Sequence, residues 1–168
     1  MPEVRAYIGV GSNIDPERHI PAGLRALQNA FGALDISPAY RSPPLGFKGA
    51  DFINCVAGID CDLGIAALIG TLKTLESNAG RQSQTTAGSR ELDLDLLLYG
   101  KQVIHSEEII LPRPDVLEYA FVLRPLAELA PTFTHPVTGH TLAWHWDNFT
   151  GEAVALAPIA LNGLESTR

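Results

Sequence analysis

Polar and apolar residues alternate most regularly between residues 90 and 98, where the chain reads Arg-Glu-Leu-Asp-Leu-Asp-Leu-Leu-Leu. Side chains of a β-strand point alternately to its two faces, so this pattern predicts a strand with Asp93 and Asp95 on one face and leucines on the other. Neighbouring carboxylates on a buried strand repel each other and lose hydration, which favours a bound cation between them. An edge strand with its aspartates in water would show the same alternation.

The rest of the chain alternates between strand patterns and helix patterns. The tandem prolines at 43 and 44 predict a rigid loop over 42–46. Residues 99–102 predict a turn, and we expect this turn to pair 103–104 with the strand that carries the aspartates. The predicted strands are 5–10, 35–41, 52–61 and 90–98, and the predicted helices are 15–31, 65–79 and 120–129.

Two further segments, 80–89 and 153–161, complete the predicted organisation of the chain. Residues 80–89 are small and polar, which predicts a mobile loop. The apolar stretch at 153–161 fits either a short helix or a strand. With no internal repeat and no linker composition, residues 1–168 are predicted to form a single domain, an α+β sandwich with a mixed sheet and helices on both faces.

The composition excludes several classes of protein. The chain has 168 residues and a net charge of −7, so it lacks the basic surface that a nucleic-acid partner requires. It has no run of about 18 apolar residues that would predict a membrane span, and its first residues do not resemble a signal peptide. We therefore expect a cytoplasmic protein with no nucleic-acid or membrane partner. Cys55 and Cys61 are expected to pack as small apolar residues and not to form a disulfide.

The aspartate pair suits one class of ion in particular. Oxygen ligands from two aspartates suit Mg²⁺, which keeps several waters and usually completes its coordination with phosphate oxygens of a substrate. Candidate cations for an anionic small molecule are Arg41, Arg81, Arg90 and Arg113. The pattern therefore points to phosphoryl chemistry.

Several separated segments coincide with one family pattern. They are 7–13 (Tyr-Ile-Gly-Val-Gly-Ser-Asn), 40–46 (Tyr-Arg-Ser-Pro-Pro-Leu-Gly), 51–54 (Asp-Phe-Ile-Asn), 90–95 (Arg-Glu-Leu-Asp-Leu-Asp) and 121–131 (Phe-Val-Leu-Arg-Pro-Leu-Ala-Glu-Leu-Ala-Pro). In this order and at these spacings, the chain resembles the 6-hydroxymethyl-7,8-dihydropterin pyrophosphokinases, enzymes of the folate pathway. The resemblance extends over residues 6–131 and rests on several independent motifs.

The resemblance implies a ferredoxin-like fold with a mostly antiparallel sheet, in a monomer or weak homo-oligomer. It also implies transfer of the terminal pyrophosphoryl group of ATP to the hydroxymethyl group of a reduced pterin, with release of AMP and with two Mg²⁺ held by Asp93 and Asp95. The implied catalytic residues are Arg81, Arg90, Asp93 and Asp95. The implied nucleotide contacts are Glu76, Arg81, Arg90 and Arg113, and the implied pterin contacts are Ser42, Pro43, Leu45, Phe52, Asn54 and Phe121.

Some of these residues have a purely structural alternative. An isolated phenylalanine more often fills a core than binds a ligand, so Phe52 and Phe121 depend on the combined motif match. Arg90 has a competing role in a salt bridge to Asp93 or Glu91.

The chain departs from the family pattern around the nucleotide. Residues 82–87 contain only Ser, Gln, Thr and Ala where family members usually carry basic residues and a tryptophan. Arg113 replaces a usual histidine, and Tyr119 replaces a usual arginine. Preorganised cations act where charge develops in the transition state, so their loss would slow the transfer. Two interpretations stay open: a divergent but working pyrophosphokinase, or a pterin-binding paralogue with weak, altered or no transfer activity.

His135, His140 and His145 form a third group of possible ligands. Their spacing of five residues puts them on no common helical face, and Pro136 and Gly139 predict a turn between them. A metal site is therefore the less favoured interpretation. We expect these residues to serve in ordinary packing near the C-terminus.

Overall fold

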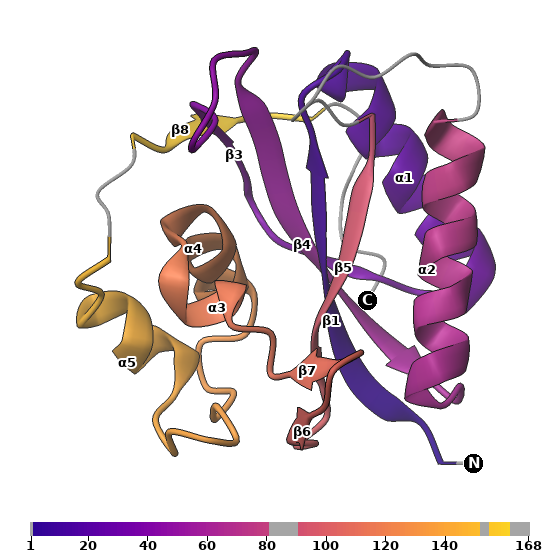
Figure 1. The fold of residues 1–168 in the computed structure, drawn as a ribbon, viewed down its shortest axis with the longest axis vertical. Coiled ribbons are helices and arrows are strands. Elements are labelled where there is room, and N and C mark those ends of the chain that lie inside the picture. The colour runs from indigo at the N-terminus through magenta and orange to yellow at the C-terminus, as the bar shows by residue number, and fades with distance from the viewer. Residues whose placement is uncertain (1, 81–90, 152–154, 162–168) are drawn as a thin grey trace.

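The computed structural model describes residues 2–80, 91–151 and 155–161. Its strands are β1 (Val4–Ser12), β2 (Asp35–Ile36), β3 (Ala39–Ser42), β4 (Phe52–Cys61), β5 (Asp93–Tyr99), β6 (Ile104–His105), β7 (Ile110–Leu111) and β8 (Ala157–Ile159). Its helices are α1 (Pro16–Phe31), α2 (Ile65–Gly80), α3 (Asp115–Glu118), α4 (Ala120–Leu129) and α5 (Leu142–Asp147). The main sheet has the order β5-β1-β4-β3-β8, with β2 paired to β4, and its described strand pairs are all antiparallel (Figure 1).

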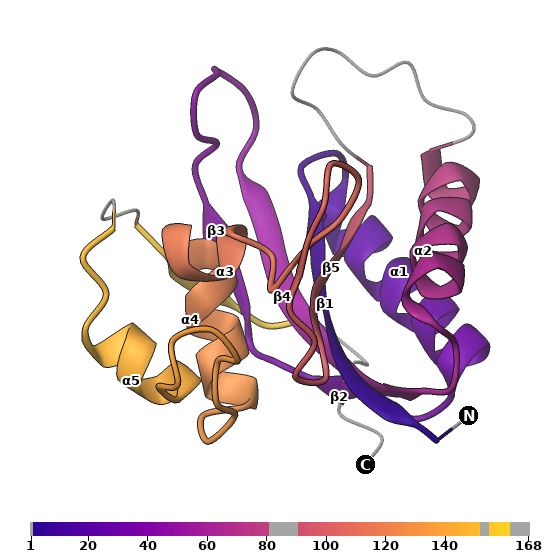
Figure 2. The same cartoon turned by 60° about the horizontal axis from the view of Figure 1, so that its bottom comes forward.

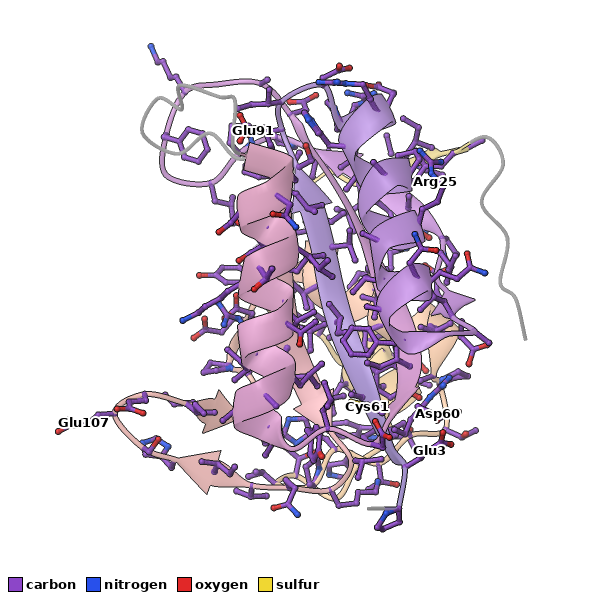
Figure 3. The ribbon with its side chains drawn as sticks, turned by 90° about the vertical axis from the view of Figure 1, so that its right-hand side faces the viewer. Glu3, Arg25, Asp60, Cys61, Glu91 and Glu107 are labelled. Atoms are coloured by element: carbon purple, nitrogen blue, oxygen red, sulfur yellow. The ribbon has the colours of Figure 1, made fainter. Side chains whose placement is uncertain are left out.

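Helices cover both faces of the main sheet (Figures 1 and 2). On one face, α1 and α2 lie side by side and bury an aliphatic core against the strands (Figure 3). On the other face, a smaller core gathers around α4 and includes Leu123, Leu126 and Val116. The succession β1-α1-β3-β4-α2-β5, with both of these helices on one face, is the ferredoxin-like arrangement. The predicted α+β sandwich is therefore confirmed, and α3, α4 and α5 form an additional layer.

The helix α1 forms where the sequence predicts it. Pro16 occupies its first position, where the missing N–H of proline costs nothing. Ile20, Leu24 and Leu27 are buried at helical spacing and face the sheet. Gly32, at φ 84°, ends the helix and donates its N–H to the carbonyl of Gln28.

The predicted strand over 35–41 is wrong in one respect, because it is divided into β2 and β3. Proline at position 38 has no N–H to donate to a strand ladder. At the break, Ser37 binds Val56 of β4 in two ways: its N–H donates to the Val56 carbonyl, and its hydroxyl accepts from the Val56 N–H at 2.7 Å. The chain therefore pairs with β4 twice instead of continuously.

The predicted pairing of 103–104 with the aspartate strand is also wrong. β6 pairs with β7, whereas β5 pairs with β1. Gly100 lies at φ 52° and donates its N–H to the carbonyl of Arg5, so the chain turns away at the end of β5. Within the apolar stretch at 153–161, left open between helix and strand, residues 157–159 form β8 against β3, and residues 153 and 154 lie outside the described residues.

Three further predictions concern the loop at 80–89, the two cysteines and the absence of a membrane span. Residues 81–90, which include most of the predicted mobile loop, lie outside the described residues. Cys55 and Cys61 are buried free thiols, as predicted, and burial raises the pKa of Cys55 to about 12. None of the described helices combines the length and apolar composition that crossing a membrane requires.

Candidate functional site

A cavity of about 560 Å³ opens on the face of the main sheet that carries α3 and α4. Its lining comes from β1, β4 and β5, from the loop after β3, and from the junction between α3 and α4. This volume lies within the range that small-molecule sites usually have.

Strand register brings the predicted polar residues to this cavity. Gly11 of β1 pairs with Asn54 of β4 on one side and with Asp93 of β5 on the other, and Gly9 pairs in the same way with Asp95. Directly paired residues of antiparallel strands point to the same face. The amide and the two carboxylates therefore surround a pair of glycines.

Gly9 and Gly11 leave the floor of the cavity open, a role that the sequence reasoning missed. A Cβ at Gly11 would lie 2.5 Å from Oδ1 of Asn54, and a Cβ at Gly9 would lie 3.4 Å from the side chain of Leu97. A side chain at Gly11 would therefore displace the amide. The available signal was a Gly-x-Gly pattern inside a strand, which puts both glycines on one face.

The residues predicted to contact a pterin all line this cavity. Phe52 packs edge-on against Phe47, with ring centroids 6.2 Å apart, and Phe121 stacks on Tyr119 at 5.2 Å. Phe47 and Tyr119 line the cavity as well. Aromatic faces of this kind suit a flat heterocycle. The predicted pterin contacts brought together here are Ser42, Pro43, Leu45, Phe52, Asn54 and Phe121.

Asp93 and Asp95 line the same cavity, on the face that their alternation with leucine predicted. Burial is the main cause that raises the pKa of Asp95. Arg113 partly offsets this effect, since its Nη2 lies 3.8 Å from Oδ1 of Asp95, whereas Asp115 adds to it. The raised pKa means that the positive charge of Arg113 does not fully offset the burial of this carboxylate.

The aspartate pair fits the implied Mg²⁺ through the chemistry of its donors. Among the residues that the structure describes, no three His, Cys, Asp or Glu side chains form a ready-made metal site. Proteins commonly bind Mg²⁺ through only one or two carboxylates, and water and substrate phosphates complete the coordination. A divalent ion would also offset the part of the burial of Asp95 that Arg113 leaves uncompensated.

A second cavity of about 210 Å³ adjoins the first, and Asp95 lines both. Glu76 and Lys73 of α2 line this second cavity together with Glu108, Arg113 and apolar residues. The carboxylate of Glu76 accepts a hydrogen bond from the N–H of Leu94 at 2.7 Å, and its pKa is raised, chiefly by burial. The predicted nucleotide contacts within the described residues thus share one cavity.

Three other arginines were candidate cations. Arg81 and Arg90 fall outside the described residues, so their predicted catalytic and nucleotide-binding roles stay predictions. Arg41 lines neither cavity and forms an ion pair with Glu17 at 2.6 Å.

Asp115 is a further site residue that the sequence reasoning missed. It is the first residue of α3, it lines the larger cavity, and its Oδ2 lies 3.2 Å from Nε of Arg113. Because α3 is a single turn of helix, no periodic pattern marks this position. The available signal was its place two residues after a candidate cation.

The three histidines do come together, although only His145 lies in a helix. The ring centroids of His135 and His145 are 5.6 Å apart, and those of His140 and His145 are 5.9 Å apart. His135 is buried, and its Nδ1 accepts hydrogen bonds from backbone N–H groups of the following turn. His140 stacks on Trp144. These contacts agree with the predicted packing role.

Comparison with known proteins identifies relatives along most of the chain. The family model for 7,8-dihydro-6-hydroxymethylpterin-pyrophosphokinase matches residues 7–131. The chain is 35% identical to a 2-amino-4-hydroxy-6-hydroxymethyldihydropteridine pyrophosphokinase of Haemophilus influenzae, over 79% of this chain and 86% of that protein. The corresponding Pseudomonas aeruginosa protein is 37% identical over 81% of this chain and 86% of its own length.

Some relatives are much longer than this chain. The chain is 35% identical to the folic acid synthesis protein fol1 of Pneumocystis carinii over 84% of its own length, but it spans only 20% of that protein. The crystal structure of wild-type Plasmodium falciparum HPPK-DHPS shares the fold, with a TM-score of 0.70, 11% identity, and coverage of 88% of this chain and 45% of that chain. The family match and the bacterial relatives establish that this chain belongs to the 7,8-dihydro-6-hydroxymethylpterin-pyrophosphokinase family.

Proposed function

We propose that this protein transfers the terminal pyrophosphoryl group of ATP to the hydroxymethyl group of 6-hydroxymethyl-7,8-dihydropterin. The observation that carries the proposal is the convergence of Asn54, Asp93 and Asp95 around Gly9 and Gly11 in one cavity. Family membership supports the same reaction. The hydroxyl oxygen of the pterin attacks the β-phosphorus and gives up its proton to solvent, the bond from that phosphorus to the α-phosphate oxygen breaks, and AMP leaves.

The larger cavity supplies the features that a pterin requires. Asn54 carries both a donor and an acceptor, which suit the polar edge of the ring system. Phe52 and Phe121 offer aromatic faces, and Pro43 limits the movement of the loop that closes one wall. In this proposal, the hydroxymethyl group points toward the aspartates of β5.

The smaller cavity is the proposed site of the nucleotide. Glu76 and Arg113 border it, and Asp95 connects it with the pterin cavity. We propose that Asp93 and Asp95 hold two Mg²⁺, which would neutralise charge on the phosphates and align them for in-line attack. Arg113 adds a cation beside them, and Arg81 and Arg90 are proposed to contribute further cations.

The same proposal places the enzyme in the cytoplasm, as a monomer or weak homo-oligomer without a nucleic-acid partner. The alternative of a pterin-binding paralogue depended mainly on the loop at 80–89, of which 81–89 lie outside the described residues, and no observation favours it. The proposal therefore keeps a single function.

The decisive experiment measures AMP release from ATP by the purified protein. We expect AMP only when 6-hydroxymethyl-7,8-dihydropterin and Mg²⁺ are both present, and we expect excess EDTA to stop its release. Omission of the pterin controls for simple ATP hydrolysis. A folded protein that released no AMP above this control would overturn the proposal.

A further inference from the structure

Arg113 occupies the boundary between the two cavities. Its backbone N–H donates to the carbonyl of Leu97 in β5 at 2.9 Å, which fixes the start of its side chain beside the aspartate strand. Arg113 lines the smaller cavity, Asp115 lines the larger one, and Asp95 lines both. The guanidinium therefore lies between the proposed nucleotide and the proposed pterin.

The carboxylates of Asp95 and Asp115 attract the guanidinium of Arg113 from two sides, but neither contact has the geometry of an ordinary hydrogen bond. Nη2 lies 3.8 Å from Oδ1 of Asp95, whereas N–H···O hydrogen bonds measure about 2.7–3.2 Å. Nε lies 3.2 Å from Oδ2 of Asp115, yet it is buried and makes no well-formed hydrogen bond within the described part of the chain. The terminal nitrogens thus retain donors that suit a phosphate oxygen.

The surrounding carboxylates stabilise the positive charge of Arg113. Burial disfavours a charged guanidinium, but Asp95 and Asp115 outweigh that effect and raise the pKa of Arg113. In return, Arg113 is the group that offsets the desolvation of Asp95. The arginine therefore acts as an internal counter-charge for an aspartate of the proposed metal site.

We propose that Asp115 is a positioning residue that holds Arg113 as the counter-charge of Asp95 and then aims it at a nucleotide phosphate. This inference rests on the proposed function. A divalent ion bound at Asp95 would neutralise that carboxylate and weaken its contact with Arg113, which would free the terminal nitrogens for a phosphate oxygen. Because the guanidinium is a rigid plane that includes Nε, it would turn as one unit, and Asp115 would keep Nε at the boundary between the cavities.

A purely structural role for Asp115 predicts different results. An acidic residue in the first turn of a helix stabilises that helix through its dipole. Glu118 lies in the same turn of α3, is exposed and lines neither cavity, so it provides a matched control. A structural role would lower stability without distinguishing between the two ligands.

The first experiment compares the two ligands in Asp115→Asn. Calorimetry would measure binding of α,β-methylene-ATP, which cannot release AMP, in the presence of Mg²⁺, and separately binding of the reduced pterin. We expect nucleotide affinity to fall about 10-fold and pterin affinity to change less than about 2-fold. Asp115→Glu should recover part of the loss, and Glu118→Gln should behave as the wild type. Unchanged nucleotide affinity, or equal losses for both ligands, would overturn the proposal.

The second experiment tests the counter-charge with Mn²⁺ alone, detected by electron paramagnetic resonance. Arg113→Gln removes the cation beside Asp95, so Mn²⁺ should bind several-fold more tightly, whereas α,β-methylene-ATP with Mg²⁺ should bind more weakly. A residue that only contacted the nucleotide would leave the affinity for Mn²⁺ unchanged. An unchanged affinity for Mn²⁺ would therefore contradict the role of Arg113 as the counter-charge of Asp95.

The third experiment asks whether Asp115 acts through Arg113. The double variant Asp115→Asn/Arg113→Gln should lose no more nucleotide affinity than Arg113→Gln alone, and additive losses would overturn the inference. Thermal unfolding verifies that each variant is folded. AMP release by the wild type tests the proposed function separately: its absence, with the expected binding shifts intact, would reject that function and leave the positioning role standing.

Discussion

The two faces of the main sheet use the same strands in opposite ways. Toward α1 and α2, β1 presents Ala6, Ile8 and Val10, which are buried in the larger core. Toward α3 and α4, the same strand presents Gly9 and Gly11, which form the floor of the cavity. β5 repeats this division, since Leu94 and Leu96 are buried in the larger core and Asp93 and Asp95 line the cavity. The same strands thus contribute side chains to the larger core on one face and to the cavity on the other.

This division separates stability from binding. We call the side toward α1 and α2 the closed face and the side toward α3 and α4 the open face. The core on the closed face removes apolar surface from water, which is the main stabilising contribution to folding. The open face leaves carboxylates partly desolvated, and it places glycines where side chains would otherwise pack. Substitutions in the larger core should therefore change the free energy of unfolding, and substitutions at the cavity on the open face should change ligand binding and catalysis.

The largest expected effect is on the open face, for Asp95→Asn. Removing one carboxylate from the proposed Mg²⁺ site should lower AMP release about 10³-fold, comparable to the loss of a preorganised transition-state contact. Thermal stability should stay equal or rise, because the change relieves repulsion at a carboxylate whose pKa burial already raises. The exposed Asp62 provides a control in Asp62→Asn. AMP release within a few-fold of the wild type would contradict a metal role.

The matching test on the closed face is Ile8→Ala. Ile8 is completely buried between the sheet and its helices, so truncation should lower the free energy of unfolding by about 3 kcal/mol. Urea unfolding measures this loss. Below the denaturation range, calorimetry should give an unchanged affinity for the reduced pterin. A stable variant with weakened pterin binding would break the separation of the two faces.

The layer on the open face should also be the more acid-sensitive one. The pKa of His135 is lowered from 6.5 to about 4, chiefly by burial and further by His145 and Lys101. The unfolded chain therefore takes up this proton first, so stability is complete above pH 6.5 and falls as the pH drops toward 4. The loss is on the order of 3 kcal/mol.

Urea unfolding at several pH values measures this acid sensitivity. His135→Asn keeps an acceptor for the backbone N–H groups of the turn and should flatten the pH dependence. His105→Gln, at an exposed position, should leave it unchanged. An unaltered pH profile in His135→Asn would assign the acid sensitivity to other groups.

A smaller effect is expected for Gly11→Ala. The added Cβ would lie 2.5 Å from Oδ1 of Asn54, so the amide must move away from the cavity floor. Affinity for the reduced pterin should fall about 10-fold, which corresponds to about 1.4 kcal/mol. Gly64→Ala is the matched control, because its Cβ would meet no atom within 4 Å. Equal pterin affinity in both variants would exclude an orienting role for Asn54.

The smallest expected effect is a gain of stability from Gly70→Ala. Gly70 lies inside α2 at an exposed position, and its Cβ would meet no atom within 4 Å. Alanine should stabilise the protein by about 0.5–1 kcal/mol, because it restricts the unfolded chain and favours the helix. Urea unfolding measures the gain, and AMP release should match the wild type. A loss of activity would show that movement of α2 contributes to the reaction.

Sequence patterns predicted most of the fold because they reflect local geometry. The helical spacing of Leu24 and Leu27 locates α1, and the alternation around Asp93 assigns each face of β5. The pairing of 103–104 was wrong because its hydrophobic pattern does not identify the partner strand. The contact from Gly100 to Arg5, distant in sequence, turns the chain away from the sheet.

The amino-acid sequence by itself determined the α+β fold class and the acidic face of β5, because periodicity is a local property, and its resemblance to a family indicated which residues to expect around the proposed pterin. The tertiary structure decided the rest. Strand register places Gly11 between Asn54 and Asp93, and the turn before α3 brings Arg113 between Asp95 and Asp115. These contacts depend on which distant segments pair and in which register, and a one-dimensional pattern does not specify that choice.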